Sequence, residues 1–345
     1  MEGVKTPLWK KILFRALIAL GCLVLLFALI VLGSNLITPL IYRDFFSRAD
    51  REFTNPGLGA GMVPQGFTYL DDRDIYLTCG YMANGEDPSR IYIVDDERDT
   101  VRYVELLEAD GDPYLGHTGG LTAAGDFVWV ANDDEGEGNC LWALSLAELL
   151  AAKNGDGIML ETAFVPESRA AFCTVDGGYL WVGEFHDGEK YKTKDSHEVT
   201  LAGGGTQNAM AFAYALDASH ETGIAQTPSM AVSLGDLVQG MARDAEGRFY
   251  LSTSYGLKKS HLLIYENALS GEHDSTITVG GEEVPVWHLT EDNLLSDVKM
   301  PPMSEEIFVD GDEVYVMFES ACRKYYFGIL LRGRGVYSYE PTFAK

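Results

Sequence analysis

The sequence predicts an all-β fold, a five-bladed β-propeller preceded by one N-terminal transmembrane helix, and three observations support this prediction. A strand–turn–strand pattern, clearest in the stretch LGHTGGLTAAGDFVWV, occurs five times along the chain. The second strands of these five copies are separated by 52, 52, 70 and 65 residues and are centred on Leu77, Trp129, Trp181, Leu251 and Val316. Repeats of this length that contain only strand hairpins are typical of propeller blades. The third observation is a long apolar run near the N-terminus.

The apolar run covers residues 12–33, follows three lysines, and contains Arg15 as its only charged residue. At ~1.5 Å per residue, about 20 residues cross a hydrocarbon core of ~30 Å. We therefore expect residues 1–11 to be a cytoplasmic tail and residues 12–33 a signal anchor in the cytoplasmic membrane. Basic residues before the span favour an N-terminus inside and a propeller outside. A cleaved signal peptide is the alternative, although its apolar region is usually only ~7–15 residues long.

The charge of the chain limits its partners. The formal net charge is −26 at pH 7, and because the first fifteen residues contribute +3, the remainder carries −29. Such an acidic domain repels nucleic acid and anionic lipid head groups, which excludes a nucleic-acid-binding function. Solubility alone explains this acidity, and binding of cations or of a basic partner is the functional alternative.

Residues 34–61 are expected to be a juxtamembrane stalk, and residues 62–345 the propeller. The five blades are predicted at about 62–115, 116–166, 167–236, 237–298 and 299–341, each with four strands whose side chains alternate between apolar and polar. The fourth strands of blades two and four are expected in MLETAFV and VPVWHLT, and the third strand of blade five in KYYFGILL. Two closures of the ring are possible. Blades one and five pack together, or a strand from residues 46–61 completes the last blade.

Two of the cysteines are placed where a disulfide could hold the ring closed. Cys79 and Cys322 follow the second strands of the first and last blades, which are neighbours in a closed ring. A disulfide between them would be compatible with an oxidising compartment. Buried free thiols fit the sequence equally well, and no CxxC spacing suggests zinc or a redox pair.

Polar residues recur at two positions of each blade. The start of the first strand and the end of the second strand lie on the same face of a blade, so these positions converge at the propeller axis, where ligands bind. The expected ligand-binding residues are Gln65, His117, Asn132, Glu184, His186, Gln239, Tyr255, Glu305 and Glu319. The alternative is that these side chains only satisfy backbone groups of neighbouring blades.

Two kinds of chemistry are compatible with these residues. His117 and Glu184 are the expected catalytic residues if the site hydrolyses a bond, because histidine titrates near neutral pH and can act as a general base. Glu184, Glu305 and Glu306 are the expected ligands of Ca²⁺, which binds six to eight oxygen atoms. His186 and His197 belong to a long excursion over residues 186–208, which is either a lid or a solvated loop.

The segments PQGFTYLDDRDIYLTCGYM, SRIYIVD, GHTGGL, LVQGMA and YLSTSYG resemble a group of uncharacterised bacterial membrane-anchored β-propeller proteins over about residues 62–320. More distantly, the blades are similar to gluconolactonase and strictosidine-synthase-like propellers. That resemblance implies a divalent metal at the axis, with Glu184 and Glu305 matching by location, although the flanking motifs are missing and those propellers have six blades. The segment Glu319–Cys322 resembles calcium-activated nucleotidases (apyrases), which also implies axial calcium.

The sequence thus predicts an extracytoplasmic, membrane-anchored propeller that binds a small molecule, a glycan or an envelope protein at its axial mouth. The alternative is a calcium-dependent hydrolase of ester, lactone or phosphoanhydride bonds. A purely structural envelope component is the third hypothesis. The sequence contains no G-x-S-x-G, H-E-x-x-H or Walker A motif that would indicate a particular reaction.

Overall fold

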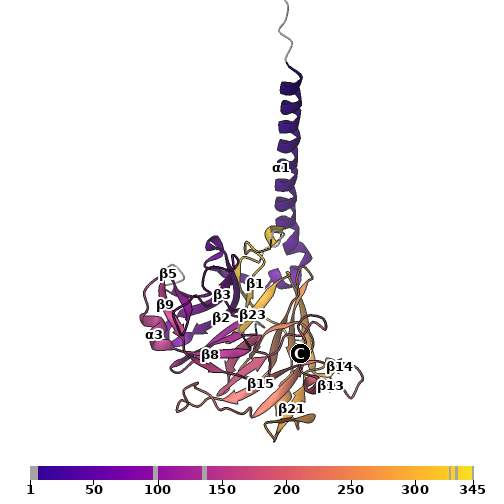
Figure 1. Cartoon of the computed structure of the whole chain (residues 1–345). Coiled ribbons are helices and arrows are strands. Elements are labelled where there is room, and N and C mark those ends of the chain that lie inside the picture. The colour runs from indigo at the N-terminus through magenta and orange to yellow at the C-terminus, as the bar shows by residue number, and fades with distance from the viewer. Residues whose placement is uncertain (1–6, 96–99, 134–137, 326–327, 331–332, 344–345) are drawn as a thin grey trace, which may run out of the picture.

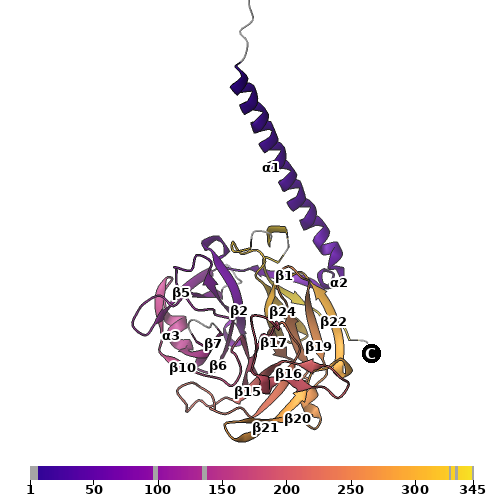
Figure 2. The ribbon, with the colours of Figure 1, turned by 45° about the vertical axis from the view of Figure 1, so that its right-hand side comes forward.

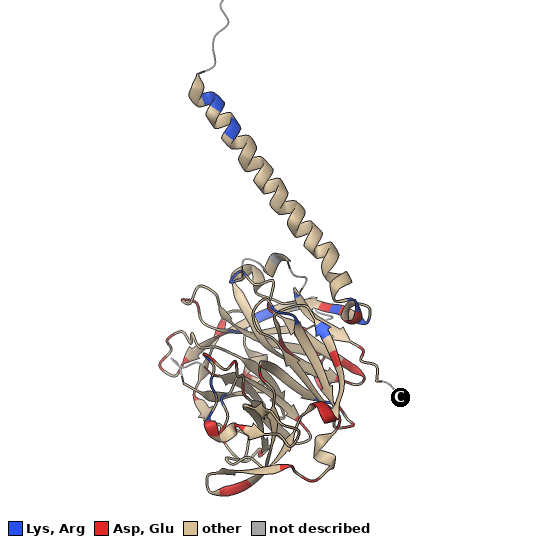
Figure 3. Cartoon of the chain, turned by 90° about the vertical axis from the view of Figure 1, so that its right-hand side faces the viewer, with Lys and Arg blue, Asp and Glu red and all other residues tan. Residues whose placement is uncertain are grey.

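The computed structural model describes residues 7–95, 100–133, 138–325, 328–330 and 333–343, which form one long helix and a β-propeller (Figure 1). Helix α1 (Leu8–Ile41) is apolar and exposed along most of its length, and by length and composition it could cross a membrane. Its basic residues lie near the free end, as Figure 3 shows. A short helix α2 (Arg43–Phe46) then leads into the propeller.

Five strands form the innermost ring of the propeller, and Figure 2 labels β2, β6 and β17 among them. They are β2 (Met62–Leu70), β6 (Gly120–Ala124), β11 (Phe172–Asp176), β17 (Val238–Arg243) and β23 (Ser304–Asp310). Each strand contacts the next, and β23 contacts β2, so the ring is closed. The predicted five-bladed propeller after one apolar helix is confirmed.

Each inner strand begins an antiparallel blade. Blade one continues with β3 (Ile75–Met82), β4 (Arg90–Asp95) and β5 (Thr100–Glu108), and blade two with β7 (Phe127–Asn132), β8 (Cys140–Ser145) and β10 (Thr162–Phe164). Blade three continues with β12 (Tyr179–Gly183), β15 (Ala209–Ala215) and β16 (Met230–Leu234), and blade four with β18 (Phe249–Thr253), β19 (Ser260–Tyr265) and β22 (Leu294–Met300). Blade five continues with β24 (Glu313–Phe318) and β25 (Gly335–Tyr339).

The outermost strand of blade five comes from the other end of the chain. Strand β1 (Ala49–Thr54) pairs antiparallel with β25, with Ala49 opposite Tyr339. The sequence left two closures of the ring open. The structure shows the second, in which a strand from residues 46–61 completes the last blade. Residues 49–54, expected within the stalk, therefore belong to a blade. Phe45 is fully buried and stacks on Tyr339 with ring centroids 5.4 Å apart, which fixes the base of the helix to the last blade.

Two outer strands differ from the prediction. The segment VPVWHLT falls largely in β21 (Glu282–His288), which pairs parallel with β16 of blade three, and β22 takes the outer place in blade four. With β20 (Ser275–Val279), β21 forms a hairpin whose Ile277, Val279, Val284 and Val286 pack into the core of blade three. Both β21 and β22 alternate apolar and polar residues, so the pattern alone does not distinguish them.

The segment MLETAFV is divided between two blades. Residues of β9 (Asp156–Leu160) pair parallel with β5 of blade one, whereas β10 pairs with β8 of blade two. Helix α3 (Leu146–Ala151), capped by the Ser145 side chain, connects β8 to β9. In KYYFGILL, residues 328–330 form a 3₁₀ turn that contacts α1, and residues 326, 327 and 331 lie outside the described residues.

The innermost glycines are required by close packing at the axis. A Cβ at Gly66 would lie 2.5 Å from the backbone nitrogen of Leu121, and one at Gly240 would lie 2.7 Å from the Cα of Glu306. These contacts are with backbone atoms that cannot easily move, so a side chain at either position would push adjacent blades apart. All five cysteines are free thiols, so Cys79 and Cys322 do not form the disulfide considered above.

Candidate binding site at the propeller axis

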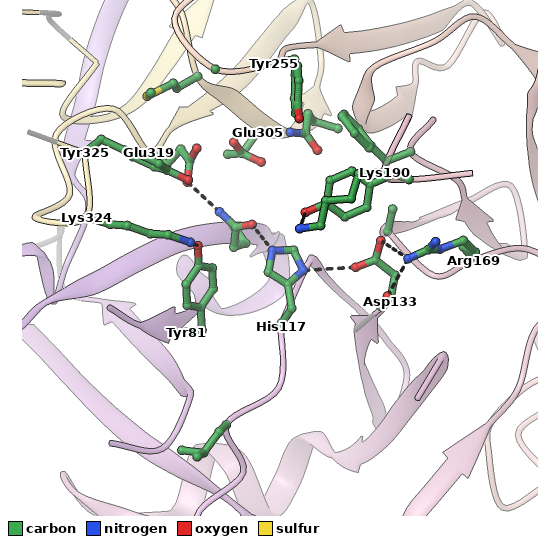
Figure 4. Close-up of a pocket in the computed structure, with 18 residues that line it drawn as sticks. Tyr81, His117, Asp133, Arg169, Lys190, Tyr255, Glu305, Glu319, Lys324 and Tyr325 are labelled. Atoms are coloured by element: carbon green, nitrogen blue, oxygen red, sulfur yellow. Dashed lines mark hydrogen bonds and ion pairs between the residues drawn. The ribbon is translucent and has the colours of Figure 1, made fainter. Parts of the chain in front are cut away.

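A cavity of about 570 Å³ opens at the mouth of the axis, and every blade contributes to its wall one residue near the start of its first strand and one near the end of its second strand (Figure 4). From the starts of the first strands come Gln65, His117, Arg169, Gln239 and Glu305. From the ends of the second strands come Tyr81, Asp133, Phe185, Tyr255 and Glu319. Loops and adjoining residues complete the lining with Leu115, Ala171, Lys190, Tyr191, Gly256, Met303, Lys324 and Tyr325.

A chain of polar contacts crosses the cavity from blade two to blade five. Gln65 Nε2 donates to the Pro64 carbonyl oxygen at 2.8 Å and to Glu319 Oε2 at 3.0 Å. Gln65 Oε1 must therefore accept, so His117 Nε2, 2.5 Å away, carries a proton. The other ring nitrogen, His117 Nδ1, lies 3.3 Å from a carboxylate oxygen of Asp133. Both ring nitrogens of His117 therefore lie near acceptor oxygens.

At the far end of this chain, two carboxyl groups lie side by side. Glu305 and Glu319 are only 3% and 7% exposed and are in hydrogen-bond contact with each other. Burial, followed by the charge of Glu319, raises the pKa of Glu305 well above its usual range. Burial raises the pKa of Glu319 to about 7. Two ionised carboxylates in contact repel each other, so ionisation of one side chain opposes ionisation of the other.

Basic side chains and tyrosines form the sides of the cavity. Lys324 Nζ donates to the Tyr81 hydroxyl at 2.5 Å, and Lys190 Nζ donates to the Tyr191 hydroxyl at 2.9 Å. Both ammonium groups also lie over aromatic rings, 4.6 Å from the ring centroid of Tyr81 and of Tyr191 respectively. Arg169 donates to the backbone oxygen of Asp133 at 2.9 Å and lies 3.7 Å from its carboxylate.

Six of the expected residues line this cavity, namely Gln65, His117, Gln239, Tyr255, Glu305 and Glu319. Asn132 and His186 do not line it. Asn132 is fully buried and donates to the Gly138 carbonyl oxygen at 2.6 Å. His186 lies 3.0 Å from Asp236 at the base of the blade-three excursion. Both lie at or near the ends of second strands, as predicted, but their side chains contact neighbouring loops.

Glu184 is also absent from the cavity, because protein groups occupy its carboxylate. It is fully buried and accepts from the backbone nitrogens of Arg169 at 3.1 Å and Met210 at 3.0 Å. His197 Nδ1 lies 2.9 Å from the same carboxylate. The expected pair of His117 and Glu184 is therefore not assembled, since each side chain has other partners. The fully buried His197 anchors the excursion rather than capping the cavity.

Glu306 acts within the innermost ring. Its carboxylate accepts from the backbone nitrogens of Phe67 at 2.8 Å and Leu121 at 2.9 Å, and it also contacts the backbone of Cys173. These three donors belong to blades one, two and three, so Glu306 holds three inner strands together. Burial raises the pKa of Glu306 well above its usual range.

The structure consequently does not bring together the three glutamates expected to bind calcium. Glu184 is held by His197 and backbone amides, Glu306 by inner strands, and only Glu305 reaches the cavity. Among the residues that the structure describes, no group of three or more His, Cys, Asp or Glu side chains is placed to hold a metal ion.

Several lining residues were not expected as site residues, and the most informative are two Lys–Tyr pairs. Lys190-Tyr191 begins five residues after Phe185, and Lys324-Tyr325 begins five residues after Glu319. Phe185 follows the end of β12 by two residues and Glu319 follows the end of β24 by one, so the two pairs have similar places in their blades. The five-residue spacing can be seen in the sequence. It indicates site residues only when the two blades are aligned at the ends of their second strands.

The comparisons with known proteins concern the overall architecture. No protein-family model matches the chain, and no curated protein matches it in sequence. The resemblances to anchored bacterial propellers and to gluconolactonase-like propellers therefore stay predictions.

Solved structures that resemble the chain include the PQQ-bound aldose sugar dehydrogenase of Streptomyces coelicolor, at 12% identity and a TM-score of 0.46 over 84% of this chain and 96% of that one. A Thermus thermophilus oxidoreductase described as a putative glucose dehydrogenase gives 12% identity and a TM-score of 0.44 over 84% and 99%. The exo-β-1,3-galactanase of Phanerochaete chrysosporium gives 11% identity and a TM-score of 0.44 over 81% and 60%. Similarity at this level carries no information about function.

Proposed function

We propose that this protein is a membrane-anchored binding protein that holds a small polar molecule in the axial cavity. The observation that carries the proposal is the convergence of all five blades, each with two side chains, on one cavity. Its volume of about 570 Å³ lies within the ~300–1,000 Å³ range of small-molecule sites. Propeller closure alone does not require His117, Tyr255 and Lys324 to face a solvent-accessible space.

The composition of the wall indicates the kind of ligand. The amides of Gln65 and Gln239 can bond hydroxyl or carbonyl groups, and the rings of Phe185 and Tyr255 provide flat apolar surface. A glycan end or a protruding segment of an envelope protein could enter the same mouth. A small molecule is favoured because the polar chain from Asp133 to Glu305 lines a cavity and not an open face.

The proposal includes an orientation in the cytoplasmic membrane. Residues 12–33 would form an uncleaved single-pass signal anchor with residues 1–11 inside, and the propeller would lie outside. The basic residues before the apolar run support this orientation, which also exposes the cavity to extracytoplasmic solutes.

A hydrolase of ester, lactone or phosphoanhydride bonds is the second candidate. One observation favours it: His117 and the carboxyl pair Glu305–Glu319 line the same cavity and are linked through Gln65. Glu319, with a pKa of about 7, could exchange a proton near neutral pH. Because protein groups occupy the Glu184 carboxylate, calcium at the axis would need other ligands, and axial calcium stays a prediction.

Thermal unfolding of the full chain in a non-ionic detergent tests the binding function. Glucose, D-glucuronate, glucose 6-phosphate and Ca²⁺ are each titrated to 10 mM. A ligand at 100 times its dissociation constant stabilises by about 2.7 kcal/mol, which is readily measured. We expect stabilisation that is lost in Tyr255→Ala and retained in Leu257→Ala, an exposed neighbour outside the axial lining. No stabilisation by any of the four, or equal stabilisation of both variants, would contradict the proposal.

A further inference from the structure

The loops between the second and third strands of the five blades lie at the mouth of the axis and differ in charge. In blades one, two and three these loops cover residues 83–89, 133–139 and 184–208 and contain eleven acidic and three basic residues. In blades four and five they cover residues 254–259 and 319–334 and contain one acidic and six basic residues. One side of the mouth face is therefore acidic and the other basic, although the chain as a whole has a formal net charge of −26.

The basic side of the mouth face presents its cations to solvent. Lys258 and Lys259 of blade four, and Arg323 and Arg334 of blade five, are all exposed. Leu257, next to the two lysines, is 58% exposed. We call these five side chains the basic patch. Attraction to anionic lipids and burial of apolar side chains together hold proteins on membrane surfaces, so the patch has the composition of a membrane contact.

Helix α1 runs past the blade-five loop that contributes to this patch. Phe45, just after the helix, stacks on Tyr339 at the end of β25 that lies away from the mouth. Helix α1 also contacts residues 328–330, which belong to the loop on the mouth side of β25. The helix therefore passes along the edge of blade five and leaves the propeller toward the mouth face. In Figures 1 and 2 the yellow loop before β25 lies on the side of the propeller from which α1 leaves.

The length of α1 places this side of the propeller at the membrane surface. Residues 16–41 of the helix contain no charged side chain. At ~1.5 Å per residue this stretch is about 39 Å long, which exceeds the ~30 Å hydrocarbon core and approaches the ~40–45 Å of the whole bilayer. With Arg15 at one membrane surface, Ile41 lies in the head-group layer of the other. Helix α2 begins two residues later, and the fully buried Phe45 fixes it to blade five.

We propose that the basic patch rests on the membrane that holds α1 and that its four cations bind anionic lipid head groups. This inference rests on the proposed membrane anchor and gives the propeller a defined orientation on it. The acidic loops of blades one to three are repelled by the same surface and face away from it. Tyr255 and Lys324 line the axial cavity and are close neighbours of the patch in the sequence, so the cavity opens beside the membrane surface.

The test measures how closely the basic patch approaches lipid head groups. The full chain is reconstituted into vesicles of phosphatidylcholine, or of phosphatidylcholine and phosphatidylglycerol in equal parts, that contain a lipid with a nitroxide quencher on its head group. A thiol-reactive fluorophore is attached at Leu257→Cys in a Cys22→Ser background, where the other four cysteines are buried. The control position is Val165→Cys, which is 70% exposed in the loop before β11 on the acidic side of the mouth.

We expect the label at Leu257→Cys to be quenched roughly twofold more, or better, in vesicles with phosphatidylglycerol, because each lysine near an anionic surface strengthens the attraction about fivefold. The label at Val165→Cys should be quenched weakly in both kinds of vesicle. Lys258→Gln with Lys259→Gln should reduce quenching at position 257 to its value in phosphatidylcholine. Arg73→Gln with Lys153→Gln removes two exposed cations from the opposite face and should leave the quenching unchanged.

Several results would overturn the inference while the anchor stands. In protein that alkaline carbonate does not extract from the vesicles, equal quenching at the two label positions, or equal quenching at position 257 in the two kinds of vesicle, would refute the contact with anionic lipid. Quenching that the lysine variant leaves unchanged, or that the opposite-face variant lowers as much, would refute the assigned patch. Extraction of the protein by alkaline carbonate would refute the anchor and this inference together, whereas ligand binding in the cavity is measured independently of both.

Discussion

The wild type is expected to lose stability as the pH rises. Replacement of both Glu305 and Glu319 by glutamine should prevent this loss. The two side chains are buried side by side in the cavity floor. Glutamine has the same shape and cannot ionise, and two adjacent amides can bond each other. The variant therefore changes the ionisation of the pair while it keeps the packing.

The direction and size of the effect follow from the pKa of Glu319. Burial raises this pKa from 4.5 to about 7 in the folded protein. A raised pKa stabilises the folded state below pH 4.5, and the contribution is lost as the pH rises through 7. A shift of this size corresponds to about 3 kcal/mol, at about 1.4 kcal/mol per pH unit. Glu305, whose pKa is also raised by burial, acts in the same direction.

The assay is thermal unfolding by circular dichroism between pH 4.5 and 8 for the full chain in a non-ionic detergent. Relative to the wild type, the double variant should gain roughly 6–12 °C in Tm over this range, from about 2–4 °C per kcal/mol in a large domain. A variant with the exposed pair Glu282→Gln and Glu340→Gln is the control and should follow the wild type. Parallel pH profiles of the wild type and the cavity variant would refute the raised pKa of Glu319.

Three further predictions concern the fold. Gly66→Ala should lower the free energy of unfolding by about 3 kcal/mol in urea, because its Cβ would lie 2.5 Å from a backbone nitrogen of blade two, whereas Gly235→Ala enters open space and should have no effect. His197→Gln removes a buried hydrogen-bond partner of Glu184 and should speed tryptic cleavage within residues 187–207, unlike the exposed control His273→Gln. Dithiothreitol at 10 mM should leave Tm unchanged, because all five cysteines are free thiols.

The blade count could be predicted because each inner hairpin has a turn and an apolar second strand at a fixed position. The outer strands could not. Residues 282–288 and 294–300 have similar alternation, and only the partner sheet decides which blade each joins. The closure by β1 was one of two possibilities, because ADREFT contains too few apolar residues to be recognised as a strand.

The lining residues near the inner strands could be predicted, because strand geometry alone places their side chains. Gln65, His117, Gln239 and Glu305 lie close to the starts of inner strands, and all four line the cavity. Residues after the second strands were harder to assign, because a one-residue change in a loop turns the side chain away. Asn132, for example, is buried, while the next residue, Asp133, faces the cavity.

The most direct test of the account is a crystal structure of the full chain with whichever of the four probes stabilises it most. We predict ligand density in the axial cavity, in contact with Gln65, Gln239 or Tyr255. Density only at another site on the propeller would contradict the account.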